Sequence, residues 1–236
     1  MKYLAIDAST EACSVALLIS DTENKAQLFS RYELCPQSHS LQLLPMVDDV
    51  LKEAGCKVQD LDGLIYGQGP GSFTGVRIGI GVAQGLAFSA EIPVVGVSTL
   101  QAMAQIAFDE QQQTQVLAAI DARMSEVYTG YYVADEHGIM QPQIEEAVLK
   151  PELLAAHYQQ FLLPSFVVGT GWDAYAPALS PLKQQTESPE ILFPTAQAML
   201  KIGIAAFEQG KGVSAEHAQP VYVRDTVSWK KLPGRE

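Results

Sequence analysis

The sequence contains few charged residues, and no apolar run in it is long enough to cross a bilayer. Charged residues make up 18% of the 236 residues and hydrophobic residues 47%. This balance excludes disorder throughout the chain, because disorder requires low hydrophobicity and high charge. The longest apolar stretch, residues 76–88, contains Arg77, Gln84 and three glycines, whereas a spanning helix needs about 20 apolar residues. We expect a globular α/β protein with no membrane partner.

Cysteine and basic residues are also scarce. The three cysteines, Cys13, Cys35 and Cys56, form no CxxC pair, and the N-terminus does not read as a signal peptide, so we expect a reduced protein in the cytoplasm. Lys and Arg number 15 against 27 for Asp and Glu, a net charge of −12. A surface this acidic repels phosphate backbones, so we expect contact with nucleic acid only where a partner supplies the basic surface.

Histidine spacing offers no standard zinc site. None of the four histidines stand four residues apart, and the HExxH motif is absent. We therefore predict no metal ligands. Residues 96–98 come close to a nucleophile elbow, but Leu100 stands where glycine belongs. Ser98, with Gln101 three residues later, is better explained as a helix cap.

Apolar periodicity predicts alternating strands and helices. Three strands, residues 3–6, 14–19 and 27–34, form a predicted meander around a polar turn at 21–24. A helix over 38–54 follows, then a strand at 64–67, a glycine turn, a helix over 74–88 and a strand at 93–97. Farther on, the pattern predicts strands at 127–133 and 166–168 and helices near 151–161 and 195–209, the last capped by Thr195 and stopped by Gly210.

A short repeat predicts two lobes. The tetrapeptide Ala-Ile-Asp-Ala at residues 5–8 recurs at 119–122, and each copy follows apolar residues and precedes a second strand. We predict lobes over 1–109 and 110–236, with the C-terminal segment free to pack back on the first lobe. The repeat would place Asp7 and Asp121 on facing walls of one cleft.

The cleft candidates are the acids and the polar or glycine residues that follow strands: Asp7, Ser9, Thr10, Gly69 and Asp121. Backbone N–H groups in such turns attract phosphate, and a carboxylate can hold a metal or a water. Two simpler explanations stay open, a polar turn in which Asp7 bonds local N–H groups and a tight turn that needs glycine only for a positive φ.

The helix after the glycine turn carries four glycines, and each costs roughly 0.5–1 kcal/mol relative to alanine. Gly75 and Gly79 share one face, and Gly81 and Gly85 share another. Such pairs allow close approach of another backbone, from either this chain or a partner subunit.

Several motifs resemble known families. The strand–Asp7-x-Ser9-Thr10–strand pattern and the duplicated lobe resemble the actin-like ATPase and sugar-kinase superfamily. The glycine motif at 66–79, together with residues 39–45, 121–128 and 229–234, is similar to the TsaB (YeaZ) family. That family supplies a bacterial subunit of the machinery that makes threonylcarbamoyladenosine (t6A) in tRNA, and it is paralogous to TsaD.

The resemblance implies two duplicated actin-like ATPase (ribonuclease H-like) lobes and a role as a non-catalytic subunit. TsaD transfers the threonylcarbamoyl group and holds its metal with an HxxxH motif, and the matching positions here are Thr99 and Met103. A threonine and a thioether do not replace two imidazoles. Family members pair with TsaD through the helices matching 38–54 and 74–88. The implied interface residues are Leu44, Val47, Leu51, Gly75, Gly79 and Val82.

The resemblance also implies further partners. TsaE, an ATPase, joins the TsaB–TsaD pair, TsaC supplies the adenylate, and tRNA is met only within the complex. No resident cofactor is expected, although ATP or ADP at the TsaD junction and a homodimer through the same helices are both open. Two other functions are weighed against this one: a phosphotransferase of the sugar-kinase type using Asp7, Thr10 and Asp121, and a peptidase.

Overall fold

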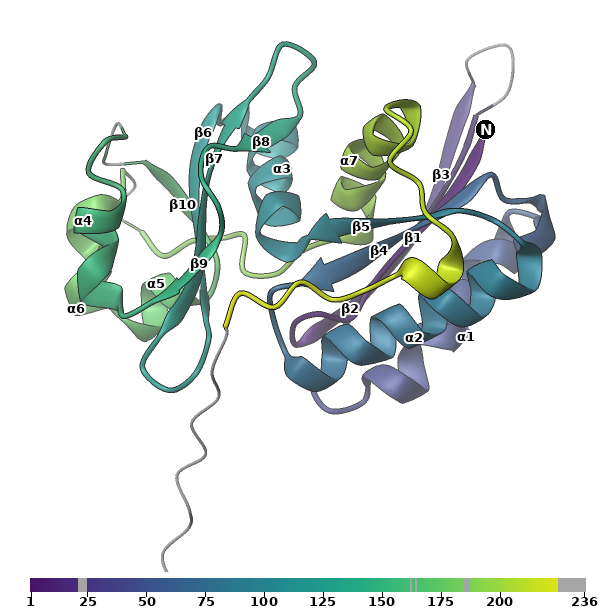
Figure 1. The fold of residues 1–236 in the computed structure, drawn as a ribbon, viewed down its shortest axis with the longest axis horizontal. Coiled ribbons are helices and arrows are strands. Elements are labelled where there is room, and N and C mark those ends of the chain that lie inside the picture. Colours follow the sequence, from purple (N-terminus) through teal and green to yellow (C-terminus); the bar gives the residue numbers. More distant parts are fainter. Residues whose placement is uncertain (21–24, 162, 164, 185–186, 225–236) are drawn as a thin grey trace, which may run out of the picture.

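The computed structural model describes residues 1–20, 25–161, 163, 165–184 and 187–224, and it contains two β-sheets with helices packed on both (Figure 1). The first sheet has the order β3-β2-β1-β4-β5. Its strands are β1 (Lys2–Asp7), β2 (Ala12–Ser20), β3 (Ala26–Leu34), β4 (Gly63–Gly69) and β5 (Val94–Ser98). β1 pairs antiparallel with β2, and β2 with β3, which confirms the predicted meander. The polar turn at 21–24 lies outside the described residues.

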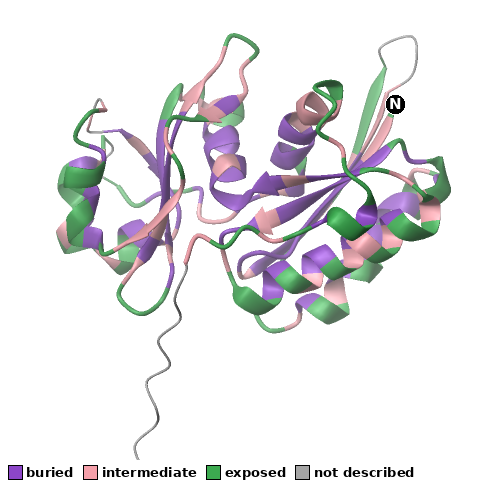
Figure 2. Cartoon of the chain, in the orientation of Figure 1, coloured by how far each residue is buried: buried purple, intermediate pink, exposed green. Residues whose placement is uncertain are grey.

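Helices cover both faces of the first sheet. Because side chains alternate along a strand, Leu4 and Ile6 face α1 (His39–Glu53) and α2 (Phe73–Ala90), whereas Ala5 faces the opposite side. That opposite side is covered by α7 (Ala196–Glu208), which comes from the far end of the chain. Figure 2 shows the central strands buried and the outer turns of α1 and α2 exposed.

The second sheet has the order β10-β6-β7-β8. Its strands are β6 (Gln115–Asp121), β7 (Val127–Ala134), β8 (Met140–Pro142) and β10 (Phe166–Val168), and β9 (Ala147–Leu149) also pairs with β7. One face packs on α3 (Thr99–Gln111). The other packs on short helices, α4 (Leu154–His157), α5 (Gly171–Ala174) and α6 (Ala176–Leu179).

The two sheets repeat one arrangement. β1 lies between antiparallel β2 and parallel β4, and β6 lies between antiparallel β7 and parallel β10. This agrees with the repeat seen in the sequence and with the predicted two-lobed α/β class. Because α7 returns to the first sheet, the second half of the chain contributes to both lobes. The residue limits 1–109 and 110–236 stay a prediction.

Several predicted helix ends are confirmed. The Ser98 side chain accepts the backbone N–H groups of Leu100 (3.1 Å) and Gln101 (3.3 Å), so it caps α3. Thr195 caps α7 by accepting the N–H of Ala198 at 3.3 Å. Gly210 follows α7 with a positive φ of 71°, a conformation that glycine adopts readily. No helix within the described residues is long and apolar enough to cross a membrane.

The helix predicted over 151–161 is wrong in extent. The chain forms a 3-10 turn at Pro151–Leu153 and the four-residue α4, and then it turns away. Beyond α4, Tyr158 and Phe161 both pack on the ring of Tyr131 in β7, with centroids at 6.2 Å and 4.5 Å. Packing of these aromatic rings on the sheet therefore overrides the helical periodicity.

Candidate functional site

A cavity of about 460 Å³ opens between the two sheets, where the loops after β1 and β6 meet. Ser9 and Thr10 line it from the loop between β1 and β2, and Asp121 and Arg123 line it from the loop between β6 and β7. The other lining residues come from the same two loops, the end of β6, the start of α1 and the residues before it, the glycine turn with the start of α2, β7 and the C-terminal segment: Glu11, Pro36, Gln37, His39, Gly71, Ser72, Phe73, Ile120, Ala122, Tyr128 and Arg224.

Asp7 lies beneath the cavity rather than on its wall, which corrects the expectation of two facing acids. Its side chain is only 1% exposed. One carboxylate oxygen accepts the N–H of Ser9 at 3.3 Å, and the other has no hydrogen-bond partner among the described residues. Burial raises the pKa of Asp7 to about 6 and outweighs the hydrogen bonds from Ser9 and Ala8, which lower it. A side chain at Gly67 would overlap this carboxylate, so glycine is required there.

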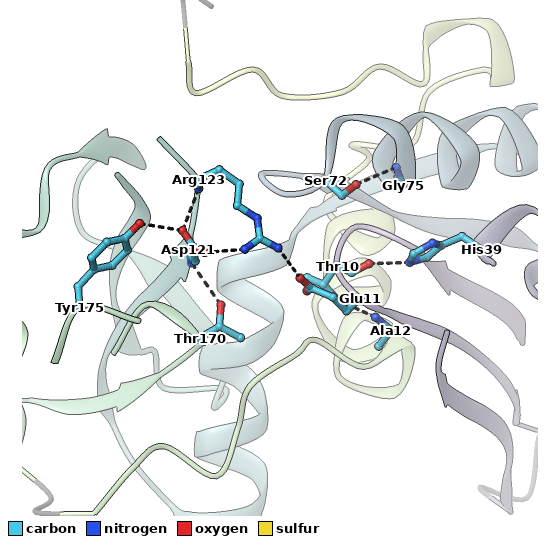
Figure 3. Close-up of polar contacts among 10 residues, drawn as sticks. All are labelled: Thr10, Glu11, Ala12, His39, Ser72, Gly75, Asp121, Arg123, Thr170 and Tyr175. Atoms are coloured by element: carbon cyan, nitrogen blue, oxygen red, sulfur yellow. Dashed lines mark hydrogen bonds and ion pairs between the residues drawn. The ribbon is translucent and has the colours of Figure 1, made fainter. Parts of the chain in front are cut away.

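Asp121 is held by its own lobe and linked to the first (Figure 3). Its carboxylate accepts the backbone N–H of Arg123 at 2.9 Å, the Tyr175 hydroxyl at 3.0 Å and the Arg123 guanidinium at 2.9 Å. The same guanidinium reaches Glu11 in the first lobe at 3.2 Å. Arg123 therefore bridges the two lobes through ion pairs with two carboxylates.

The loop of Arg123 has an unusual backbone. Arg123, Met124 and Ser125 have φ values of 62°, 56° and 61°, a region that costs roughly 1–2 kcal/mol for each non-glycine residue. The contacts of Arg123 with Asp121 and Glu11 help to hold this conformation. The sequence shows the bulk of these side chains but carries no signal for the bridge.

The glycine turn packs directly on the loop after β1. A Cβ atom at Gly71 would lie 2.1 Å from the carbonyl oxygen of Ser9, and one at Gly75 would lie 2.1 Å from the carbonyl oxygen of Ala8. The backbone N–H of Ser72 donates to that Ser9 oxygen at 2.7 Å. Close backbone packing, rather than a positive φ, thus accounts for these two glycines. Gly69, the last residue of β4, has a φ of 94°.

The two residues at the positions that match the HxxxH motif have structural roles in the interior. Thr99 and Met103 are fully buried. The Thr99 hydroxyl donates to the Ser9 hydroxyl at 2.9 Å, and Met103 packs in the core of the second sheet. Neither side chain presents a donor suited to an imidazole-bound metal.

The C-terminal segment packs back on the first lobe, as the sequence analysis allowed, and its residue Arg224 lines the cavity. The N–H of Val221 donates to the carbonyl of Gln68 at 2.9 Å. Arg224 pairs with Glu126 at 2.5 Å and lies over the ring of Tyr128. The second cationic residue of the cavity is therefore also paired. The motif at 229–234 lies outside the described residues.

The predicted interface on α1 is partly wrong. Val47 and Leu51 are buried in the first lobe with Leu43 and Val50, so they offer no surface. Leu44 is 48% exposed. The sheet buries a face of α1 rotated from the one predicted, and this leaves Leu44 outside.

On α2, Gly75 and Gly79 approach the backbone of Ala8, so these two predicted interface residues are also internal. A Cβ atom added at Gly81 or Gly85 would meet no described atom within 4 Å. Val82 is half-buried. We call the exposed residues of the two adjoining helices, together with the half-buried Val82, the outer face; it comprises Leu41, Leu44, Gly81, Val82, Gly85 and Phe88.

Comparison with known proteins places the chain in a family. The family model for TsaD, tRNA N6-adenosine threonylcarbamoyltransferase, matches residues 21–208. The tRNA threonylcarbamoyladenosine biosynthesis protein TsaB of Escherichia coli is 51% identical over 236 residues, covering 100% of both chains. The chain belongs to the TsaB family. The TsaB of Haemophilus influenzae is 43% identical over 100% of this chain and 99% of its own.

Solved structures agree with the TsaB assignment. A Pseudomonas aeruginosa protein described as similar to peptidase YeaZ is 44% identical, has a TM-score of 0.82, and matches over 94% of this chain and 99% of its own. YeaZ from the same organism is 43% identical, with a TM-score of 0.80 and the same coverage. The two-lobed actin-like fold implied by the TsaB resemblance is confirmed.

Proposed function

We propose that this TsaB-family chain acts in t6A biosynthesis as a non-catalytic cytoplasmic subunit that completes a TsaD enzyme. The observation that carries the pathway is the 51% identity, over the whole of both chains, to a protein named for t6A biosynthesis. The modified base would be the adenosine beside the anticodon. The subunit role rests on two features of the structure, the filled cleft and the exposed outer face.

The cleft supports a role without chemistry of its own. Asp7 is buried beneath the floor, and Asp121 is occupied by Arg123 and Tyr175. Both arginines of the cavity, Arg123 and Arg224, are paired with carboxylates. A phosphotransferase would need unpaired cations or a metal site facing the phosphates, so this arrangement does not favour the sugar-kinase alternative. Calorimetry of the isolated chain with ATP and magnesium tests that alternative directly.

The outer face supports pairing with TsaD. The chain matches the TsaD family model through residues 21–208, a range that contains both α1 and α2. A paralogue would thus present the equivalent helices, and two such surfaces can pair in an approximately two-fold arrangement. Gly81 and Gly85 leave open space on α2, so a partner helix could approach closely. A homodimer would use the same face and would compete with TsaD.

The remaining partners follow from the resemblance. TsaE would join the assembled pair, TsaC would supply the adenylate, and the net charge of −12 leaves tRNA binding to the complex. We propose no resident nucleotide cofactor in this chain; ATP or ADP would bind only at the junction with TsaD.

Charge substitution on the outer face tests the pairing. Leu44→Glu and Val82→Glu should abolish co-purification with TsaD from the same organism, because each places a carboxylate in an apolar contact. Leu28→Glu is the matched control, since Leu28 lies on β3 and is 43% exposed, close to the 48% of Leu44. Circular dichroism and thermal melting establish that all three variants fold.

Two readouts complete the test. Light scattering measures the mass of each variant alone and mixed with TsaD, and mass spectrometry of tRNA nucleosides measures t6A in cells that depend on the variant. Loss of both pairing and t6A in Leu44→Glu and Val82→Glu, with neither lost in Leu28→Glu, is the expected result. Full pairing by the outer-face variants would contradict the interface, and turnover by the isolated chain would contradict the non-catalytic role.

A further inference from the structure

Three buried side chains beneath the cleft bring two sulfur atoms and an imidazole together. The ligand atoms of Cys13, Cys35 and His39 all lie within 4.8 Å of one another. All three residues are buried, and the two cysteines are free thiols. The spacing of 22 residues between the two cysteines matches no zinc motif. The cluster therefore cannot be detected from the sequence and is seen only in the folded structure.

The fold assembles the cluster from three neighbouring elements. Cys13 lies in β2, and Cys35 directly follows β3, with its N–H donating to the carbonyl of Glu11 at 3.0 Å. Since β2 and β3 pair through Ala12 and Leu34, the two cysteines stand near the same end of this hairpin. His39 is the first residue of α1 and completes the cluster.

The hydrogen bond of His39 sets its tautomer. Its Nε2 atom lies 2.6 Å from the carbonyl oxygen of Thr10. A carbonyl only accepts, so Nε2 carries the hydrogen, and in the neutral imidazole Nδ1 then has a lone pair. A ring nitrogen that donates to a backbone carbonyl is the usual second interaction of a metal-bound histidine, because it orients the ring and raises its basicity.

We propose that Cys13, Cys35 and His39 form a binding site for a thiophilic closed-shell cation, Zn²⁺ or Cu⁺. Thiolate and imidazole ligands select these ions, whereas magnesium and calcium require oxygen ligands. On binding, each thiol releases its proton to solvent as its sulfur coordinates the cation. Both thiols are buried, so a role as an exposed reactive thiolate is not supported.

The charge of the two thiolates favours Zn²⁺, whereas the number of protein ligands favours Cu⁺. The experiment below distinguishes the two ions. Two thiolates balance the charge of Zn²⁺ completely, which suits a buried site. Zn²⁺ prefers four ligands, and a water could enter as the fourth because His39 also lines the cleft cavity. Cu⁺ would need no fourth ligand but would leave one negative charge. In either case the cation would link the β2–β3 hairpin to the first turn of α1.

Metal titration of the whole purified chain tests the proposal. The protein is stripped with a chelator under reducing conditions and titrated with Zn²⁺ and, separately, Cu⁺ in competition with chromophoric chelators. Co²⁺ serves as a spectroscopic probe, since thiolate coordination gives a charge-transfer band. We expect one equivalent of at least one of the two ions, with thiolate–Co²⁺ absorption and a raised melting temperature.

Matched cysteine variants locate the site. Cys13→Ser and Cys35→Ser should weaken binding by about 100-fold or more, since loss of an outer partner alone costs 10–100-fold. Cys56→Ser removes the third buried cysteine and should bind as the unchanged chain does. Stoichiometric binding of only one of the two ions identifies that ion as the one that the site binds. Stoichiometric binding of both ions supports a site for thiophilic cations that does not distinguish between them.

Measurements on the unchanged chain are sufficient to refute the proposed site. The test therefore does not depend on whether the variants fold. Absence of both stoichiometric binding and a thiolate–Co²⁺ band in the unchanged chain would refute the site. Equal binding by a folded Cys13→Ser variant would also refute it. Neither result depends on TsaD, so the outcome is independent of the proposed function.

Discussion

The buried carboxylate of Asp7 predicts an unusual dependence of stability on pH. Its pKa is raised from 3.8 to about 6 in the folded chain, chiefly because burial disfavours the charged form. The folded state therefore holds this proton more tightly than the unfolded state between about pH 4 and 6. Stability contributed by the protonated group is present at low pH and is lost as the pH rises through this window.

The magnitude follows from the difference in pKa. A difference of about 2 at about 1.4 kcal/mol each gives about 3 kcal/mol of destabilisation above pH 6. Roughly half of this develops by pH 5 and nearly all by pH 7. Asp7→Asn removes the titration while keeping the shape of the side chain and an oxygen that can accept the N–H of Ser9. The free energy of unfolding of Asp7→Asn minus that of the unchanged chain should therefore rise with pH.

Urea unfolding at several pH values from 4 to 7.5 measures this difference. A fixed cost or gain of the amide shifts every point equally, so the slope is the diagnostic quantity. The expected rise is about 2–3 kcal/mol across the range. Asp49→Asn makes the same chemical change at an exposed position of α1 and serves as the comparison. A flat difference for Asp7→Asn would show that the carboxylate is not destabilising, and the reasoning would fail.

Three further predictions concern local packing. Gly75→Ala should destabilise the chain by roughly 1–3 kcal/mol, because its Cβ would meet a backbone carbonyl at 2.1 Å, whereas Gly81→Ala on the same helix should stabilise it by roughly 0.5–1 kcal/mol. Thermal melting of the pair checks both signs. Arg224→Ala should cost about 1–3 kcal/mol, since it leaves the partly buried Glu126 without its cation, and should make the segment before it easier to cleave in limited proteolysis. Thr195→Ala should cost about 1 kcal/mol by removing the cap of α7, measured by urea unfolding.

The sequence predicts this fold well where one local signal decides an element. The meander, the caps Ser98 and Thr195 and the repeat around Asp7 and Asp121 each depend on a few adjacent residues, and the structure contains all of them. The prediction fails where tertiary packing decides. The predicted face of α1 is rotated by part of a turn from the face that packs on the sheet. The prediction groups Leu44 with Val47 and Leu51, but Leu44 is exposed and the other two are buried.

The candidate site was harder to predict because its contacts span the whole chain. The bridge from Arg123 to Glu11 joins residues 112 apart, and the pairing of Arg224 with Glu126 joins residues 98 apart. No spacing rule detects such pairs. The cysteine cluster has the same character, because strand pairing rather than a motif brings Cys13 to Cys35.

These long-range contacts also bear on the proposed role of the chain as a subunit. Ser9 accepts the N–H of Ser72 through its carbonyl and the hydroxyl of Thr99 through its side chain, so the cleft loop is tied to both α2 and α3. Arg123 ties the same loop region to the second lobe. The polar groups of the cleft thus contact one another across both lobes and tie the cleft loop to the start of α2. In the proposed pairing, an outer face on a helix that is already packed in place would lose little conformational freedom, which suits a scaffold for another enzyme.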